Sequence, residues 1–404
     1  MLEGVRILDL SEEPGQLAGK ILGDLGADVI KLEPPGGDTL RRRGPFLGER
    51  ADAERSLPWL ALNTSKRGIT LALATPRGQD LFRRLAARAD VVLETAAPGT
   101  LEALGLGWES LHAGLPRLIW CSLTPFGRTG PWAHYRAHDL VLVALGGNAA
   151  LTGDPDRAPL RCTLPTAYYA AGPEAAAGIA MALYARSRSG RGQLVDVSLH
   201  ECQLATLVTA PGQYSLAPNL RGRPGPRIAG TREIWRAKDG DVSFGLRGGA
   251  ARAPSLAATV AWMAEDGMAP EWLLAIDWTK YNHNLLAPEE IARLEAAFGA
   301  FFATKTRREL FEQALARRIM LAPCNDAREI LEQAQLRSRD LFTTLEYPEL
   351  GARIEHPDFF AKASRSRIGI RRRAPRVGEH NAEVYGELGL DVEALRELAA
   401  EGVI

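Results

Sequence analysis

Residues 5–32 begin with VRILDL (Val5–Leu10), continue through SEEPGQLAGKILGDLG and end with ADVIKL (Ala27–Leu32). The two short apolar runs are typical of buried strands, and the amphipathic stretch Gly15–Leu25 between them predicts a helix. Two strands joined by a helix are expected to lie parallel in one sheet. This stretch of the sequence therefore favours an α/β fold.

The alternation of strands and helices continues along the N-terminal half. Thr75 and Pro76 predict a helix start, with Thr75 as the N-cap and Pro76 in the first helical position. The expected helix face is Leu81, Phe82, Leu85 and Ala86, and the further expected strands are Ile69–Leu73, Val91–Leu93, Leu118–Ser122 and Gln193–Leu199. Together with an Ala-rich helix over Ala170–Arg186, these elements predict a large, doubly wound parallel-sheet domain.

The character of the sequence changes after a Pro/Gly-rich stretch, Arg221–Gly230, which favours a linker. Short strands around Glu233–Leu246 and helices over Pro288–Ala303 and Thr306–Arg318 predict a smaller α+β domain. The expected domains are residues 1–222, 223–325 and 326–404, the last being a return segment that packs on the large domain. Its final helix is expected to be capped by Asp391, with Leu395 and Leu398 facing inward.

Composition argues against several classes of function. Lys and Arg together number 49, as do Asp and Glu, so nothing favours binding to nucleic acid or to a membrane surface. The run Arg41–Arg43 is expected to form a solvated face. The four cysteines are far apart in sequence, and no signal peptide or long apolar run is visible, so we expect reduced thiols and a cytoplasmic protein.

Common cofactor and metal motifs are missing from the sequence. The first strand is not followed by the G-x-G-x-x-G pattern of dinucleotide-binding folds, and neither a phosphate loop nor a G-x-S-x-G nucleophile elbow occurs. His134 and His138 are four residues apart, which would place them on one face of a helix. No Cys, Asp or Glu set accompanies them at ligand spacing, so no metal site is expected.

Several segments, in order along nearly the whole chain, resemble the class III CoA-transferase family. They include LEGVRILDL, LGDLGADVIKLEPPGGD, NTSKRGITL, PRLIWCSLTPFGRTGP, ALYARSRSGRGQLVDVSL and PRVGEHNAEVYGELGL. The family includes formyl-CoA transferases, carnitine CoA-transferases and acyl-CoA racemases. The resemblance implies a ring of large and small domains, with two subunits interlocked as in a chain. It also implies active sites between the large domain of one subunit and the small domain of the other.

The resemblance also indicates where the nucleophile should be. In the family an aspartate attacks the thioester and forms a mixed anhydride. Counting back from the Ala-rich helix places that position at Tyr168, bracketed by Pro165 and Gly172 at the family's spacing. A phenol is mostly neutral at pH 7 and cannot form an activated anhydride. Glu174 is the nearest carboxylate in this segment, and only a shifted register would bring it into use.

The positions at which the family usually contacts CoA are also altered, and the resemblance implies that Arg, Lys, Asp, Asn, Phe or Gln has been replaced there. These positions are Pro34, Ala72, Thr95, Ala96, Ala103 and Val143. Charged side chains at such positions hold phosphates through strong hydrogen bonds. We therefore expect no tightly bound cofactor, and a CoA thioester held by a partner subunit.

A chain that keeps the fold and lacks the nucleophile is expected to serve as the non-catalytic subunit of a heterodimer. Its partner would be a homologue that carries the aspartate. The loop Arg247-Gly248-Gly249 could reach the partner's site, with glycine N–H groups facing an acyl oxyanion and Arg247 facing a carboxylate. Two alternatives stay open, namely a racemase that uses His138 and Asp139 as acid or base, and a purely structural or regulatory subunit.

Overall fold

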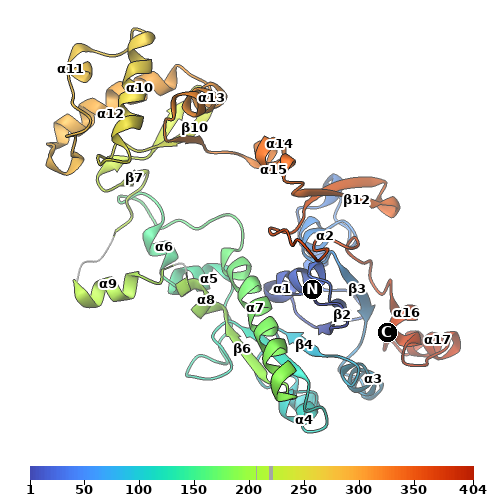
Figure 1. Ribbon diagram of the computed structural model, residues 1–404. Coiled ribbons are helices and arrows are strands. Elements are labelled where there is room, and N and C mark those ends of the chain that lie inside the picture. Colours follow the sequence, from blue (N-terminus) through green and yellow to red (C-terminus); the bar gives the residue numbers. More distant parts are fainter. Residues whose placement is uncertain (206, 218–221) are drawn as a thin grey trace. The chain divides into compact units, whose positions relative to one another are not determined.

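The computed structural model describes residues 1–205, 207–217 and 222–404 (Figure 1). The chain divides into two compact units. Unit 1 comprises Met1–Ala149, Arg161–Asn219 and Ala334–Ile404, and unit 2 comprises Ala150–Leu160 and Leu220–Gln333. Unit 2 thus includes Ala150–Leu160, a segment that the sequence analysis assigned to the large domain, and residues 326–333, which it assigned to the return segment. Of the expected linker, Arg221 lies outside the described residues.

A six-stranded parallel sheet forms the centre of unit 1, in the order β3-β2-β1-β4-β5-β6. Leu8 in the central strand pairs with Ile30 on one side and with Val92 on the other. The strands are β1 (Arg6–Asp9), β2 (Asp28–Glu33), β3 (Lys66–Thr70), β4 (Val91–Glu94), β5 (Ile119–Thr124) and β6 (Leu194–Ser198). The strand order reverses direction between β1 and β4, so the predicted doubly wound α/β fold is confirmed.

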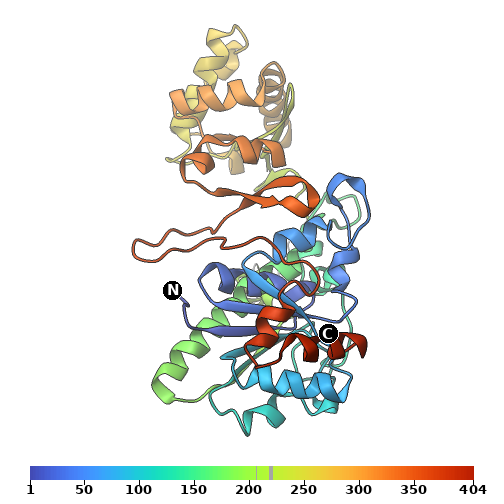
Figure 2. The ribbon, with the colours of Figure 1, turned by 90° about the vertical axis from the view of Figure 1, so that its right-hand side faces the viewer.

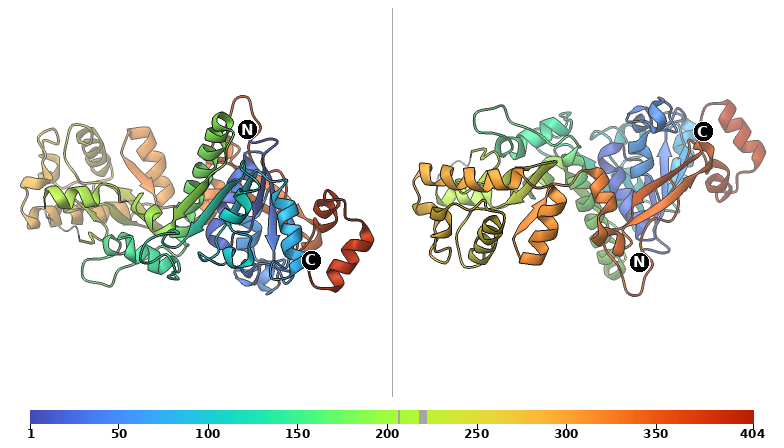
Figure 3. Two further views of the ribbon diagram at one scale, coloured as in Figure 1. Left: turned by 90° about the horizontal axis from the view of Figure 1, so that it is seen from below. Right: turned by 90° about the horizontal axis from the view of Figure 1, so that it is seen from above.

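Helices cover both faces of this sheet, each over its own apolar cluster. On one face lie α1 (Glu13–Asp24), α5 (Asp139–Leu145), α7 (Thr166–Ser189) and α8 (Leu199–Ala205). On the other face lie α3 (Pro76–Ala86), α4 (Trp108–His112), α16 (Asn381–Gly386) and α17 (Val392–Ala400). Figure 3 shows green α7 and light-blue α3 on opposite sides of the strands. Unit 1 also contains α2 (Leu57–Leu62) and α9 (Ala210–Leu216), and α6 (Asn148–Leu151) begins in it.

The sequence predicted the start of α3 correctly but placed the start of β3 too late. Thr75 Oγ1 accepts a hydrogen bond from Gly78 N–H at 3.0 Å, and Pro76 is the first helical residue, as predicted. The strand expected over Ile69–Leu73 instead begins at Lys66. Its first two residues are basic and nevertheless buried, because Lys66 pairs with Asp9 and Arg67 pairs with Asp28. A pattern based on apolar residues cannot detect such a start.

The C-terminal part of unit 1 completes the edge of the sheet at β3. The N–H of Gly68 donates to Nδ1 of His380 at 3.1 Å, and the N–H of Thr70 donates to Oδ1 of Asn381 at 2.9 Å. The carbonyl of Thr70 accepts from the hydroxyl of Tyr385 at 2.7 Å. Figure 2 shows red α16 and α17 beside light-blue α3. The chain returns to this edge through the hairpin β12 (Phe342–Tyr347) and β13 (Ala352–Pro357), preceded by α15 (Ala334–Ser338). Asp391 caps α17 as expected, with Leu398 buried.

Unit 2 is an α+β unit with its own aromatic core. Trp235, Phe244, Phe298 and Phe302 pack together in it, each with no more than 1% of its surface exposed. The antiparallel strands are β9 (Ile234–Ala237), β10 (Gly240–Phe244) and β11 (Leu321–Pro323), and a short pair is formed by β7 (Arg227–Ile228) and β8 (Thr231–Arg232). Its helices are α10 (Ala253–Glu265), α11 (Glu271–Leu274), α12 (Pro288–Ala303), α13 (Arg307–Arg317) and α14 (Ala327–Glu332). None of the helices in the described ranges has the length and apolar character needed to cross a bilayer.

Candidate functional site

A cavity of about 540 Å³ opens in unit 1, lined by residues that follow the carboxyl ends of β1, β4 and β5. Glu13, Thr95, His138 and Tyr168 contribute to its wall. The place is the one expected for ligands in open parallel sheets, where strands on either side of a reversal in strand order diverge. The structure thus brings together Tyr168, Thr95 and His138, three residues that the sequence analysis selected separately.

Two helix starts cap each other beside this cavity. The Tyr168 hydroxyl oxygen accepts a hydrogen bond from the backbone N–H of Asp139 at 3.2 Å. In return, Oδ1 of Asp139 accepts one from the N–H of Ala167 at 2.9 Å. Pro165, the N-cap of α7, offers no side-chain acceptor of its own. Tyr168 therefore has a structural partner at the position where the family resemblance places a nucleophile.

Burial keeps the Tyr168 phenol neutral. The residue is 8% exposed, and its pKa is raised mainly by burial, with further increases from the charges of Glu13 and Asp139. The hydrogen bond from the N–H of Asp139 acts in the opposite direction and does not prevail. A neutral hydroxyl in this position is a poor nucleophile.

His138 and Asp139 have different surroundings. His138 is exposed and faces the cavity, whereas Asp139 is 9% exposed and accepts the hydrogen bond from Ala167. His134 also lines the cavity, but residues 131–138 are not helical, so the two histidines do not share a helix face as their spacing suggested. In the described part of the chain, no group of three or more His, Cys, Asp or Glu residues could hold a metal ion.

Glu13 is a residue of the site that the sequence analysis missed. It is the first residue of α1, its side chain is 11% exposed, and it lines the cavity. Its Oε2 pairs with Arg43, whereas Oε1 has no hydrogen-bond partner among the described residues. Burial raises the pKa of Glu13, the negative charges of Asp139 and Asp38 add to this, and Arg43 opposes it. The signal in the sequence was a pair of acids directly after the first strand and before Pro14.

Of the six altered CoA-contact positions, Thr95 is the one that lines this cavity; its Oγ1 accepts a hydrogen bond from the N–H of Glu12 at 2.8 Å. The other five are outside the cavity lining that the described residues form. Pro34 and Ala103 are exposed, and Ala72 and Ala96 are partly buried. Val143, in α5, is 3% exposed and lies in the apolar core. Their assignment as former CoA contacts stays a prediction.

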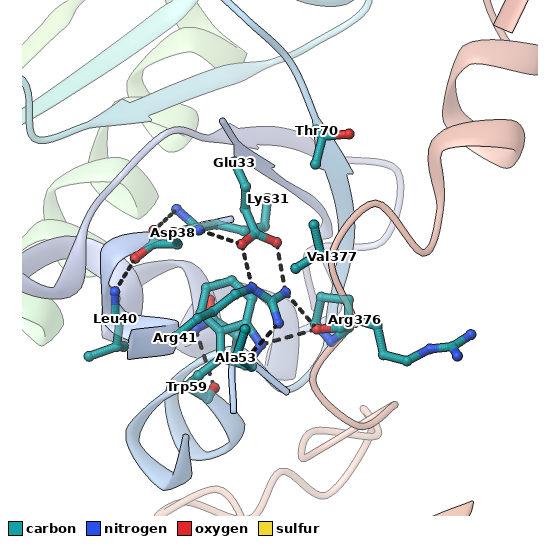
Figure 4. A network of polar contacts seen from close by, with 12 residues as sticks. Lys31, Glu33, Asp38, Leu40, Arg41, Ala53, Trp59, Thr70, Arg376 and Val377 are labelled. Atoms are coloured by element: carbon teal, nitrogen blue, oxygen red, sulfur yellow. Dashed lines mark hydrogen bonds and ion pairs between the residues drawn. The ribbon is translucent and has the colours of Figure 1, made fainter. Parts of the chain in front are cut away.

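A buried ionic network stabilises the segment that follows β2 (Figure 4). Arg41 forms two hydrogen bonds with Glu33, at 2.6 and 2.8 Å, and its guanidinium carbon lies 3.7 Å from the centre of the Trp59 ring. Lys31 pairs with Asp38 at 3.1 Å. Because Arg41 is 1% exposed, the expectation that Arg41–Arg43 forms a solvated face is wrong for Arg41. Its donors are used within the protein and are not available to a phosphate.

The loop Arg247-Gly248-Gly249 lies in unit 2 and has internal contacts of its own. Arg247 pairs with Glu233 at 2.6 Å, and the N–H of Gly248 donates to Nδ1 of His283 at 3.2 Å. A side chain at position 248 would collide with the carbonyl of Tyr281. These contacts explain within unit 2 why a glycine is required at position 248. A contribution of this loop to a partner's site stays a prediction.

Glu174 does not face the cavity that holds Tyr168. It is exposed on α7 and lines a different surface groove, together with Asp196 and Cys202. Burial raises the pKa of the Cys202 thiol to about 11, so that thiol is unreactive at neutral pH. The described geometry therefore gives no support to a shifted register in which Glu174 replaces the aspartate.

Comparisons with known proteins agree with this architecture. A profile described as CoA-transferase family III matches residues 2–381. The chain is 34% identical to the BbsE subunit of succinyl-CoA:(R)-benzylsuccinate CoA-transferase from Thauera aromatica, over 99% of this chain and 97% of that one. It is 30% identical to the beta subunit of succinyl-CoA–L-malate CoA-transferase from Chloroflexus aurantiacus, over 100% and 98%.

The structural comparison points the same way. The crystal structure of a CAIB/BAIF family protein from Brucella suis superposes with a TM-score of 0.82 and 28% identity, over 96% of this chain and 99% of that one. Sequence and fold thus match over nearly the whole length of both chains. The chain belongs to CoA-transferase family III.

Proposed function

We propose that this chain is the non-catalytic subunit of a heteromeric class III CoA-transferase, paired with a homologue that carries the nucleophilic aspartate. The observation that carries the proposal is Tyr168. It occupies the position that the family resemblance gives to the aspartate, and its neutral hydroxyl accepts a hydrogen bond from the N–H of Asp139. An acyl group cannot be held there as a mixed anhydride.

The reaction of the complex would move CoA from a thioester such as succinyl-CoA to an organic acid. The best candidate acceptor is (R)-benzylsuccinate, as in anaerobic toluene degradation. The relative from Thauera aromatica, named as one subunit of such an enzyme, supports both the substrate pair and the presence of a partner. The partner would hold the CoA thioester, and the loop Arg247–Gly249 would contribute from this chain to the partner's site.

The racemase alternative requires a free acid or base at His138 and Asp139. His138 is exposed at the cavity, but the Asp139 carboxylate accepts the N–H of Ala167 at the start of α7. This hydrogen bond holds Oδ1 of Asp139 at the start of α7 and limits how the carboxylate can turn towards a substrate. The geometry thus favours a structural use of Asp139.

The proposal is tested by assaying CoA transfer from succinyl-CoA to (R)-benzylsuccinate with this chain alone, the homologous partner alone, and the co-expressed pair. We expect transfer by the pair only, and no hydroxylamine-trapped acyl intermediate on this chain. The matched control is a pair in which the partner's aspartate is changed to asparagine, which should be inactive. Activity of that pair, or of this chain alone, would contradict the proposal. Full activity of the partner alone would instead indicate a regulatory or structural subunit.

A further inference from the structure

Oε1 of Glu13 is a buried carboxylate oxygen in the wall of the cavity. Buried carboxylate oxygens normally have a hydrogen-bond partner, and a buried one without a partner calls for an explanation. Oε1 of Glu13 has none among the described residues, although the side chain is only 11% exposed and lines the cavity next to Tyr168. Glu13 is the first residue of α1, and three residues separate it from the end of β1 at Asp9.

The charge of Glu13 is only partly compensated. Arg43 pairs with Oε2, but the Arg43 side chain is 49% exposed and its charge is therefore screened by water. Asp139 and Asp38 lie close enough for their negative charges to act on Glu13. Arg136 also lines the cavity, but it is exposed, so water screens its charge. A second carboxylate placed next to Glu13 would thus meet a negative charge at short range, in surroundings that screen it less than water does.

We propose that Glu13 is a specificity-determining residue that excludes acyl thioesters bearing a terminal carboxylate from the cavity of this chain. An uncharged acyl chain of the same length is tolerated there. The inference rests on the proposed function, because it states which thioesters the non-catalytic subunit leaves to its partner. A dicarboxylic donor such as succinyl-CoA then does not occupy a cavity that cannot process it.

The size of the effect follows from charge separation. Two like charges about 6 Å apart at an effective dielectric constant of about 20 repel strongly enough to weaken binding about a hundredfold. Salt and partial compensation by Arg43 reduce this figure, so a discrimination of at least about tenfold is expected. Succinyl-CoA and butyryl-CoA provide the comparison, since both have a four-carbon acyl chain and only the terminal group differs.

The test measures binding of both thioesters by isothermal titration calorimetry at pH 8. The proteins are the full-length wild type, Glu13→Gln and Glu397→Gln. Wild type should bind butyryl-CoA at least about tenfold more tightly than succinyl-CoA, and Glu13→Gln should remove most of that preference by gaining affinity for succinyl-CoA. Glu397→Gln makes the same charge change at an exposed residue of α17 that is outside the cavity lining, and it should keep the wild-type ratio.

Each possible result of these titrations either supports or contradicts the role of Glu13. If wild type binds butyryl-CoA but not succinyl-CoA, and Glu13→Gln binds both, the exclusion by Glu13 is supported. An unchanged ratio in Glu13→Gln would overturn it, as would an equal effect of Glu397→Gln. A wild type that prefers succinyl-CoA or binds neither thioester would also overturn it. Should Glu13→Gln fail to fold, as judged by thermal unfolding, Glu13→Ala is measured in its place. CoA transfer by the isolated wild type would contradict the proposed function. The ratio of the two binding affinities tests the role of Glu13 independently of that result.

Discussion

The hydroxyl oxygen of Tyr168 lies 3.2 Å from the backbone nitrogen of Asp139 and accepts its hydrogen bond, so the first residue of α5 is capped by a side chain from α7. The Asp139 carboxylate caps α7 in the same way through Ala167. Each helix start thus depends on the other. This reciprocity explains how an aromatic residue can be accommodated at a position that the family resemblance assigns to an acid.

Replacing Tyr168 should cost stability without creating an enzyme. Tyr168→Phe removes one hydrogen bond to a buried N–H, and we expect a loss of about 1 kcal/mol in the free energy of unfolding, measured with urea. Tyr168→Asp should stay inactive when assayed alone with succinyl-CoA, because the charges of Glu13 and Asp139 would favour the protonated acid. CoA transfer by the isolated Tyr168→Asp chain would contradict the view that this site is retired.

Asp139 should behave as a helix cap and not as an acid or base. Asp139→Ala leaves the N–H of Ala167 without its acceptor and should destabilise the protein by about 1–2 kcal/mol in chemical denaturation. Asp139→Asn retains an acceptor oxygen and should lose clearly less. If the racemase alternative were right, Asp139→Asn would instead abolish an activity of the isolated chain while leaving its stability almost unchanged.

Removing one partner of the ion pair between Lys66 and Asp9 should destabilise the protein strongly, whereas removing both partners together should destabilise it much less. Both side chains are fully buried and 2.8 Å apart, and the charges of Lys66 and Lys31 lower the pKa of Asp9 although burial alone would raise it. Lys66→Met leaves a buried carboxylate without its main partner, and we expect a loss of about 3–5 kcal/mol. The double variant Asp9→Leu/Lys66→Met should recover most of it. A double variant as unstable as the single one would argue against this account.

His356 should make the stability of unit 1 depend on pH. Burial lowers its pKa from 6.5 to about 4, with Lys20 contributing, and its Nε2 lies 3.1 Å from the Tyr347 hydroxyl. Because the folded-state value is the lower one, this contribution is complete above pH 6.5 and is lost as the pH falls towards 4. The loss is about 3 kcal/mol at most. In urea titrations at pH 7.5 and 4.5, His356→Gln should show a smaller decrease than wild type, since Gln does not titrate.

The fold was largely predictable because most of its signals are local. Apolar runs marked five of the six strands of the sheet to within one or two residues, and Thr75-Pro76 marked the start of α3. The exception, β3, begins with Lys66 and Arg67, whose burial depends on acids far away in the sequence. Tertiary ion pairs of this kind leave no periodic trace in the sequence.

The site was less predictable, because a cavity is formed by residues that only the tertiary structure brings together. Thr95, His138 and Tyr168 were selected from the family resemblance and do converge. Val143 was selected in the same way and lies in the core. Glu13 was overlooked because the segment after β1 was compared with a glycine-rich loop and set aside. Its role depends on its place in the cavity wall, which only the tertiary structure shows.

The closing of the β3 edge by His380, Asn381 and Tyr385 has a consequence for biosynthesis. A ribosome must translate more than three hundred residues after β3 before the groups that cover it exist. During that interval the outer edge of β3 is exposed, although its inner edge can pair with β2, and open strand edges recruit other chains. Translation that stops before α16 should therefore yield aggregates, and chaperones have their clearest point of action here.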